Sequence, residues 1–149
     1  MNNKEKITFD WLKRYTGTDP GDYGDWILLT NFQNYVEKFA NKFTTKINGL
    51  GGPMTSAINK DGLSIINFGI GSANAATIMD LLSCIKPKGV LFLGKCGGLK
   101  KPLKLGILFC LQHRLEVKVQ VMTTFLKKFL QCPPSSFTNM FRNYWLNVI

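Results

Sequence analysis

Three short, mostly apolar runs constrain this chain more than any other feature, because each is too short for a typical helix and too apolar for a loop. They cover residues 26–29, 63–68 and 89–93. Apolar runs of this length predict strands that are buried on both faces of a sheet. Helical spacing of apolar residues follows the first two runs, over 32–43 and 73–84. This order predicts an α/β sheet, at least partly parallel, with helices on both faces.

The segments outside these strands contain signals of turns and helix ends. A short helix is predicted over residues 4–15, and three of its apolar side chains are expected to face inward: Phe9, Trp11 and Leu12. Thr30-Asn31 can cap the helix over 32–43. Residues 47–62 are interpreted as a loop or hairpin with a tight turn at Asp61-Gly62.

Two of the strands end in glycine-rich turns, FGIGSANAA and LGKCGG. Open α/β sheets bind ligands beyond the carboxyl ends of their strands. Glycine there lets backbone N–H groups approach an anion, and a following helix N-terminus adds a favourable dipole. Lys95 adds a positive charge and Ser72 a hydroxyl, which together suit a phosphate. The alternative is that these glycines serve only tight turns and close packing. GIGS is not a Rossmann fingerprint, since the third glycine and a later acidic residue are missing.

The formal net charge of +10 suits an anionic partner, but the basic residues are scattered along the chain. We therefore expect neither nucleic acid nor a membrane as partner, and no apolar run approaches the ~20 residues of a transmembrane helix. The four cysteines lack CxxC spacing and there is one histidine, so no metal or other cofactor is expected. Without a signal peptide in MNNKEKITFDWLKRY, the chain is expected to be cytoplasmic.

The segment IINFGIGSANAATIMDLLSCIKPKGVLFLGKCGGL resembles the nucleoside phosphorylase and nucleosidase superfamily, which pairs a GxGxxxA turn with a later GT/S-x-GG turn. RYTGTD and DWILLTNFQNYVEKFA are similar to segments of AMP nucleosidases, which cleave AMP to adenine and ribose 5-phosphate. The resemblance covers residues 9–106. It implies the N-terminal part of a phosphorylase/hydrolase-like three-layer fold with a central mixed sheet. It also implies AMP as the substrate, a role in purine metabolism and AMP salvage, and a homo-oligomer for the intact protein.

The resemblance further implies which residues meet the substrate. Seven residues are expected to line its phosphate, ribose and base: Asn31, Gly69, Gly71, Ser72, Lys95, Cys96 and Gly97. Phosphorylases have Thr or Ser in place of Lys95. They also place arginines after the first strand and before the second glycine turn, where this chain has TNFQNYV and VLFLGKC. Their absence makes a phosphate co-substrate doubtful and favours hydrolysis. Cys96 is expected to pack, not to act as a nucleophile.

In the family, a carboxylate beyond the matching region protonates the leaving purine, so no catalytic residue is assigned here. Asp61 in a turn and Asp80 on a helix are not expected to replace it. The leading hypothesis is an AMP nucleosidase whose chain is truncated and inactive. One alternative is a relative of the purine or uridine nucleoside phosphorylases. Another is a non-enzymatic basic binding module.

The composition changes abruptly after Gly106. All 14 glycines lie at or before that residue, and residues 107–149 contain one acidic residue and no alanine. Loss of one nucleotide near Gly106 would explain the change, because a permitted choice of bases in the neighbouring frame restores GDFILP and IRGEGTS without a stop codon. We therefore expect residues 1–106 to be the nucleosidase portion and 107–149 an out-of-frame tail. The alternative is a membrane-surface or partner-binding segment in the tail.

Overall fold

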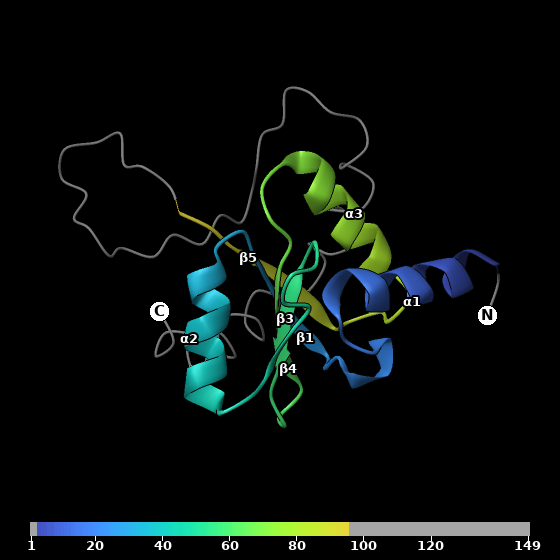
Figure 1. Ribbon diagram of the computed structural model, residues 1–149. Helices are drawn as coiled ribbons and strands as arrows, with labels where there is room; N and C mark the ends of the chain where they lie inside the picture. The colour runs from blue at the N-terminus through green and yellow to red at the C-terminus, as the bar shows by residue number, and fades with distance from the viewer. Residues whose placement is uncertain (1–2, 96–149) are drawn as a thin grey trace.

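The structure is a computed structural model that describes residues 3–95. One sheet lies between α2 on one face and α1 with α3 on the other (Figure 1). The elements follow in the order α1 (Asn3–Thr16), η1 (Pro20–Asp22), β1 (Trp26–Thr30), α2 (Gln33–Phe43), β2 (Ile47–Asn48), β3 (Thr55–Ile58), β4 (Leu63–Asn67), α3 (Ser72–Leu82) and β5 (Gly89–Leu93). The expected α/β class with a central mixed sheet is confirmed, and the three predicted strands are β1, β4 and β5.

The sheet has the strand order β2-β3-β4-β1-β5. β1 is parallel to both of its neighbours, whereas β2, β3 and β4 pair antiparallel. The register places Thr30 of β1 opposite Asn67 of β4 and Leu93 of β5. The carboxyl ends of all three parallel strands therefore reach the same edge of the sheet. We call this edge, with the residues that directly follow Thr30, Asn67 and Leu93, the carboxyl edge.

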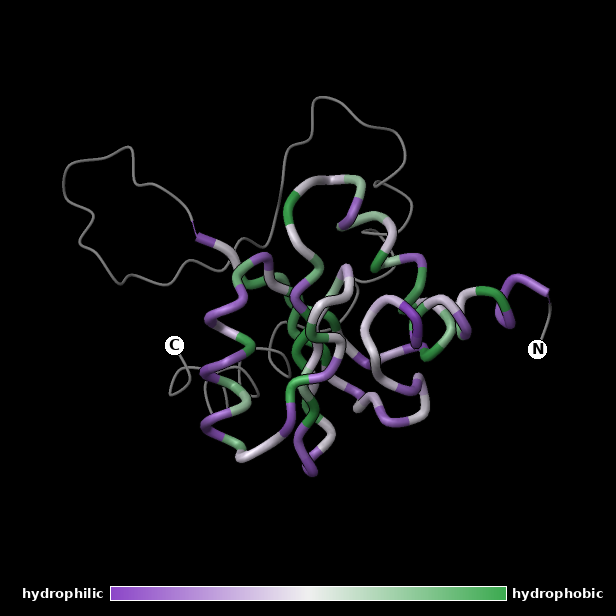
Figure 2. Tube along the Cα trace, viewed as in Figure 1, coloured by the Kyte–Doolittle hydropathy of each residue, from purple (hydrophilic) through white to green (hydrophobic). Residues whose placement is uncertain are grey.

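β1 is apolar on both faces because each face packs against a helical layer. Ile27 and Leu29 join the core beneath α1 and α3, while Leu28 joins the core beneath α2. Figure 2 shows apolar residues along the central strands and hydrophilic residues on the outer side of α2. A strand of continuous apolar residues is what burial on both faces requires.

α1 faces the core through a different set of residues from the one predicted. Leu12 is fully buried as expected, but Phe9 and Trp11 are exposed, so that part of the prediction was wrong. The inward stripe is Thr8, Leu12 and Thr16, at a spacing of four residues. Thr8 and Thr16 can lie inward because their hydroxyls donate to the helix's own carbonyls, those of Lys4 and Leu12. Because two of the three inward residues are polar, a hydrophobicity pattern could not identify the buried face of α1.

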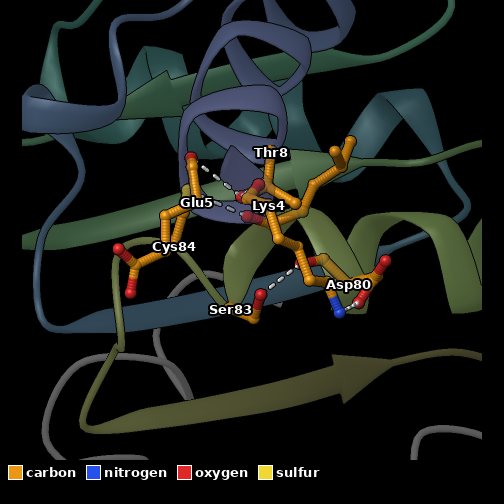
Figure 3. Close-up of polar contacts among 7 residues, drawn as sticks. Lys4, Glu5, Thr8, Asp80, Ser83 and Cys84 are labelled. Carbon is orange, nitrogen blue, oxygen red and sulfur yellow. Dashed lines mark hydrogen bonds and ion pairs between the residues drawn. The ribbon is translucent and has the colours of Figure 1, made fainter. Parts of the chain in front are cut away.

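α1 packs along α3, and Figure 3 shows the polar contacts at this junction. Lys4 Nζ lies 3.3 Å from Asp80 Oδ1, and both side chains are largely exposed. An exposed pair of this kind contributes little to stability. The contact nevertheless places Asp80 against α1, about two turns along α3 from its first residue, Ser72.

The RYTGT segment joins the end of α1 to the antiparallel part of the sheet. The Thr18 and Ser56 hydroxyls are 2.7 Å apart, and Asn48 Nδ2 donates to Thr18 Oγ1 at 2.9 Å. Gly17 has φ +69°, and a Cβ there would lie 2.5 Å from the backbone nitrogen of Gly49. This motif therefore has a structural role: the backbones approach too closely for any side chain at Gly17.

Residues 47–62, interpreted as a loop or hairpin, form a hairpin: β2 pairs antiparallel with β3, and β3 in turn pairs antiparallel with β4. One further local prediction needed correction. The helix over 32–43 is not capped by Thr30-Asn31: its N-cap is Phe32, with no side-chain cap bond. Thr30 Oγ1 instead accepts the Phe32 N–H at 3.2 Å.

Candidate functional site

The carboxyl edge between β1 and β4 is a topological switch point. The chain leaves β1 into α2, which covers one face of the sheet, and leaves the neighbouring β4 into α3, which covers the other. Open α/β sheets bind their ligands where neighbouring strands send the chain to opposite faces. In Figure 1 the starts of α2 and α3 and the end of β5 lie at this same end of the sheet.

The turn between β4 and α3 presents backbone N–H groups at this edge. Gly69 has φ +77° and Gly71 has φ +112°, conformations that favour glycine. The Gly69 N–H donates to Asn67 Oδ1 at 3.0 Å, which fixes the start of the turn. Gly71 is the N-cap of α3 and supplies no side-chain cap bond, so the first N–H groups of the helix have no such partner. Ser72, the first residue of α3, is exposed.

α2 begins beside this turn, and its first N–H groups also lack a side-chain cap. Its N-cap, Phe32, cannot accept a hydrogen bond through its side chain. Neither α2 nor α3 has an acidic residue in its first turn. Two helix N-termini without carboxylates make the edge favourable for an anion, because each carries a partial positive charge.

Lys95 brings a full positive charge to the same place. It follows β5, is exposed, and its Nζ lies 4.4 Å from the centroid of the Phe32 ring. The structure therefore joins the second predicted turn to the loop after β1, as expected from parallel strands whose ends align.

Two amide side chains connect the loop after β1 to the turn after β4. Gln33 Oε1 accepts hydrogen bonds from Thr55 Oγ1 at 2.6 Å and from Asn67 Nδ2 at 3.0 Å. Asn67 in turn accepts from Gly69. Asn31 Oδ1 is buried and accepts no hydrogen bond from residues 3–95. The edge thus contains both a fixed polar network and an acceptor that the described residues leave unused.

Five of the seven predicted site residues belong to this edge: Asn31, Gly69, Gly71, Ser72 and Lys95. Cys96 and Gly97 lie outside the described residues. Asp61 lies at the opposite edge, in the turn before β4, where Asn59 Nδ2 donates to its carboxylate at 3.2 Å. Asp80 contacts Lys4. Neither carboxylate reaches the carboxyl edge.

Sequence reasoning missed Phe32, Gln33, Tyr35 and Asn67. Phe32 falls within the helical pattern over 32–43, four residues before Val36, whereas in the structure it is the N-cap of α2 at the strand end. Its position directly after Asn31 was the available signal. Gln33 and Asn67 carried no signal, because their hydrogen bond joins residues far apart in the sequence.

Within residues 3–95, no cluster of three histidine, cysteine or acidic side chains could bind a metal. The same part of the chain has no helix with the length and hydrophobicity to cross a membrane.

Comparison with known proteins gives matches by sequence and by structure. No family model matches the chain. By sequence it is 27% identical to the AMP nucleosidases of Escherichia coli K12 and O157:H7, over 64% of this chain and 27% of each relative. The crystal structure of AMP nucleosidase from Bacteroides thetaiotaomicron superposes with a TM-score of 0.62 and 51% identity, over 66% of this chain and 42% of that one. The chain thus spans less than half the length of these relatives. Over about two thirds of its own length, it is a homologue of the AMP nucleosidases.

Proposed function

We propose that this chain belongs to an enzyme that hydrolyses the N-glycosidic bond of AMP, giving adenine and ribose 5-phosphate, and that its carboxyl edge binds the sugar phosphate. One observation carries the proposal: two helix N-termini without acidic residues lie at the switch point, and Lys95 lies against the N-cap of one of them, Phe32. Such a site favours an anion. The AMP nucleosidase relatives identify AMP as the anion to test.

Each predicted site residue receives a role in this proposal. The N–H groups that follow Gly69 and Gly71, with the Ser72 hydroxyl, bind phosphate oxygens, and Lys95 supplies the charge. Asn31 Oδ1 accepts a hydrogen bond from a ribose hydroxyl, which would give this buried atom a partner. Cys96 and Gly97, outside the described residues, retain their proposed place beside the ribose and base. Fixed donors of this kind orient a substrate for reaction.

We also propose that this chain binds AMP without cleaving it. Protonation of the leaving adenine by a positioned acid is worth about 10²–10⁴ in rate. Asp61 and Asp80 lie away from the carboxyl edge, so neither can protonate a base bound there. The absence of arginine from TNFQNYV and VLFLGKC supports hydrolysis over phosphorolysis. A cytoplasmic homo-oligomer remains part of the proposal for the intact protein.

AMP titration by calorimetry, combined with chromatographic detection of adenine, tests this function. We expect saturable AMP binding by the full chain and no adenine release above the uncatalysed rate. Absence of binding would contradict the proposed site. Adenine release without phosphate would contradict the proposed inactivity. Formation of ribose 1-phosphate from adenosine or uridine, only when phosphate is present, would identify a nucleoside phosphorylase instead. Strongly salt-dependent binding of DNA would favour the basic binding module.

A further inference from the structure

Lys95 lies against a pair of aromatic rings at the start of α2. Its Nζ is 4.4 Å from the centroid of the Phe32 ring and 5.7 Å from that of Tyr35. The two rings meet edge to face, with centroids 5.6 Å apart and planes at 76°. Aromatic pairs prefer this arrangement, and a ring face within about 6 Å attracts an ammonium group through its quadrupole.

Among residues 3–95, no acidic side chain forms an ion pair with Lys95. The ion pairs of residues 3–95 join Lys4, Lys13, Arg14 and Lys88 to aspartates, and none of them includes Lys95. The helix dipole also disfavours a cation beside the N-cap of α2. Phe32 and Tyr35 are therefore the described groups that stabilise the ammonium group at this position.

An aromatic contact differs from an ion pair in its effect on ligand binding. A carboxylate would orient the lysine but cancel its charge, whereas a ring orients it and leaves the full charge available to an anion. Restricting a long side chain before binding also lowers the entropy that is lost when the ligand arrives.

Building on the function proposed above, we propose that Phe32 and Tyr35 are positioning residues that hold the Lys95 ammonium at the carboxyl edge for the sugar phosphate. The rings do not themselves contact the phosphate in this account. They determine where the charge lies, and Lys95 binds the anion.

Nuclear magnetic resonance of the free full-length chain tests the positioning without any ligand. A ring face shifts nearby protons upfield, so the Lys95 side-chain methylene protons should resonate upfield of those of exposed lysines such as Lys4. The shift should disappear in Phe32→Leu. The same substitution at an aromatic residue away from the carboxyl edge, Phe9→Leu on α1, should leave it unchanged. Lys95 protons at the position of an exposed lysine would overturn the proposal.

A double-mutant cycle then tests whether the rings act through Lys95. Ribose 5-phosphate is titrated into wild type, Phe32→Leu, Lys95→Met and the double variant, with Phe9→Leu as the control. Phe32→Leu should weaken binding roughly two- to fivefold, the range of an exposed cation–π contact. It should have no effect once Lys95 is Met. An equal loss in both backgrounds would overturn the proposal, since the ring would then act independently of Lys95.

A second variant and a second measurement cover the cases in which Phe32→Leu does not fold or wild type does not bind ribose 5-phosphate. If Phe32→Leu does not fold, 3,4,5-trifluorophenylalanine at position 32 keeps the ring's shape and weakens its quadrupole, so the same comparison is made with that variant. If wild type does not bind ribose 5-phosphate, the proposed function fails. The positioning of Lys95 is then decided by the proton shift alone.

Discussion

The backbone conformation of Gly71, and not contact with neighbouring atoms, makes a side chain at this position destabilising. It has φ +112° and ψ 149°, and a Cβ there would meet nothing within 4 Å. This region of backbone conformation is almost restricted to glycine and costs other residues about 1–3 kcal/mol. Gly71→Ala should therefore lower the free energy of unfolding by about that amount, as measured by urea denaturation. Gly21→Ala is the matched control, because that glycine needs no positive φ. Equal losses in both variants would contradict this reading of the turn.

Tyr23 gives the protein a pH dependence that a single variant can isolate. Its hydroxyl is buried, and burial raises the pKa of the phenol. The unfolded phenol ionises near pH 10, so above about pH 10 the unfolded state loses its proton first and stability falls. Burial also raises the pKa of the Cys84 thiol, which acts in the same direction in any Tyr23 variant. Tyr23→Phe should therefore show a shallower loss of stability between about pH 9 and pH 11 than wild type. Parallel curves for the two proteins would count against a buried phenol.

At the scale of elements, Gln33 connects α2 to two strands through one side-chain oxygen. Replacing it with leucine leaves the Thr55 hydroxyl and the Asn67 amide without their acceptor. Gln33→Leu should destabilise the protein by about 1–3 kcal/mol, the usual cost of unpaired buried polar groups. Gln33→Glu keeps an oxygen at the same position and should lose less. If the glutamate variant is the less stable of the two, the acceptor role is refuted.

The elements that sequence reasoning identified correctly are those whose pattern follows directly from burial. β1, β4 and β5 were found because apolar runs mark strands within a sheet. β2 and β3 were left open between a loop and a hairpin, because residues such as Thr55 and Ser56 are buried by pairing with β4 and by hydrogen bonds. Phe92 of β5 is 56% exposed, although its run predicted a buried strand. Among the described strands, β5 pairs only with β1, so that side chain lies at an edge.

The candidate site divides in the same way. Its glycines and Lys95 were predictable because a ligand-binding turn needs a particular backbone and charge directly after a strand. Gln33, Asn67 and the aromatic pair at Phe32 and Tyr35 were not, because their roles depend on contacts between distant segments. Local patterns identify which turns can bind a ligand, whereas the three-dimensional fold determines which side chains support them.

At the scale of the whole molecule, we propose that the nucleosidase portion ends at Gly106 and that an out-of-frame tail follows it. Residues 107–149 lie outside the described residues, and the proposal for them rests on composition: no glycine, one acidic residue and no alanine. Resequencing the gene across codons 104–110 and past codon 149 should reveal one additional base that restores an open frame beginning with GD after Leu105. A confirmed present frame, with no family-like frame downstream, would refute the proposal and give the basic tail a function of its own to explain.

The most direct measurement of the central claim is a titration of the ¹⁵N-labelled full chain with AMP, followed through its backbone amide resonances. The account predicts shifts concentrated at the carboxyl edge, in Asn31, Gly69, Gly71, Ser72 and Lys95, with little change in α1. Ribose 5-phosphate should shift the same amides, because the phosphate and ribose are the groups assigned to this edge. Shifts absent from these residues, or centred on α1 and the opposite edge near Asp61, would contradict the account.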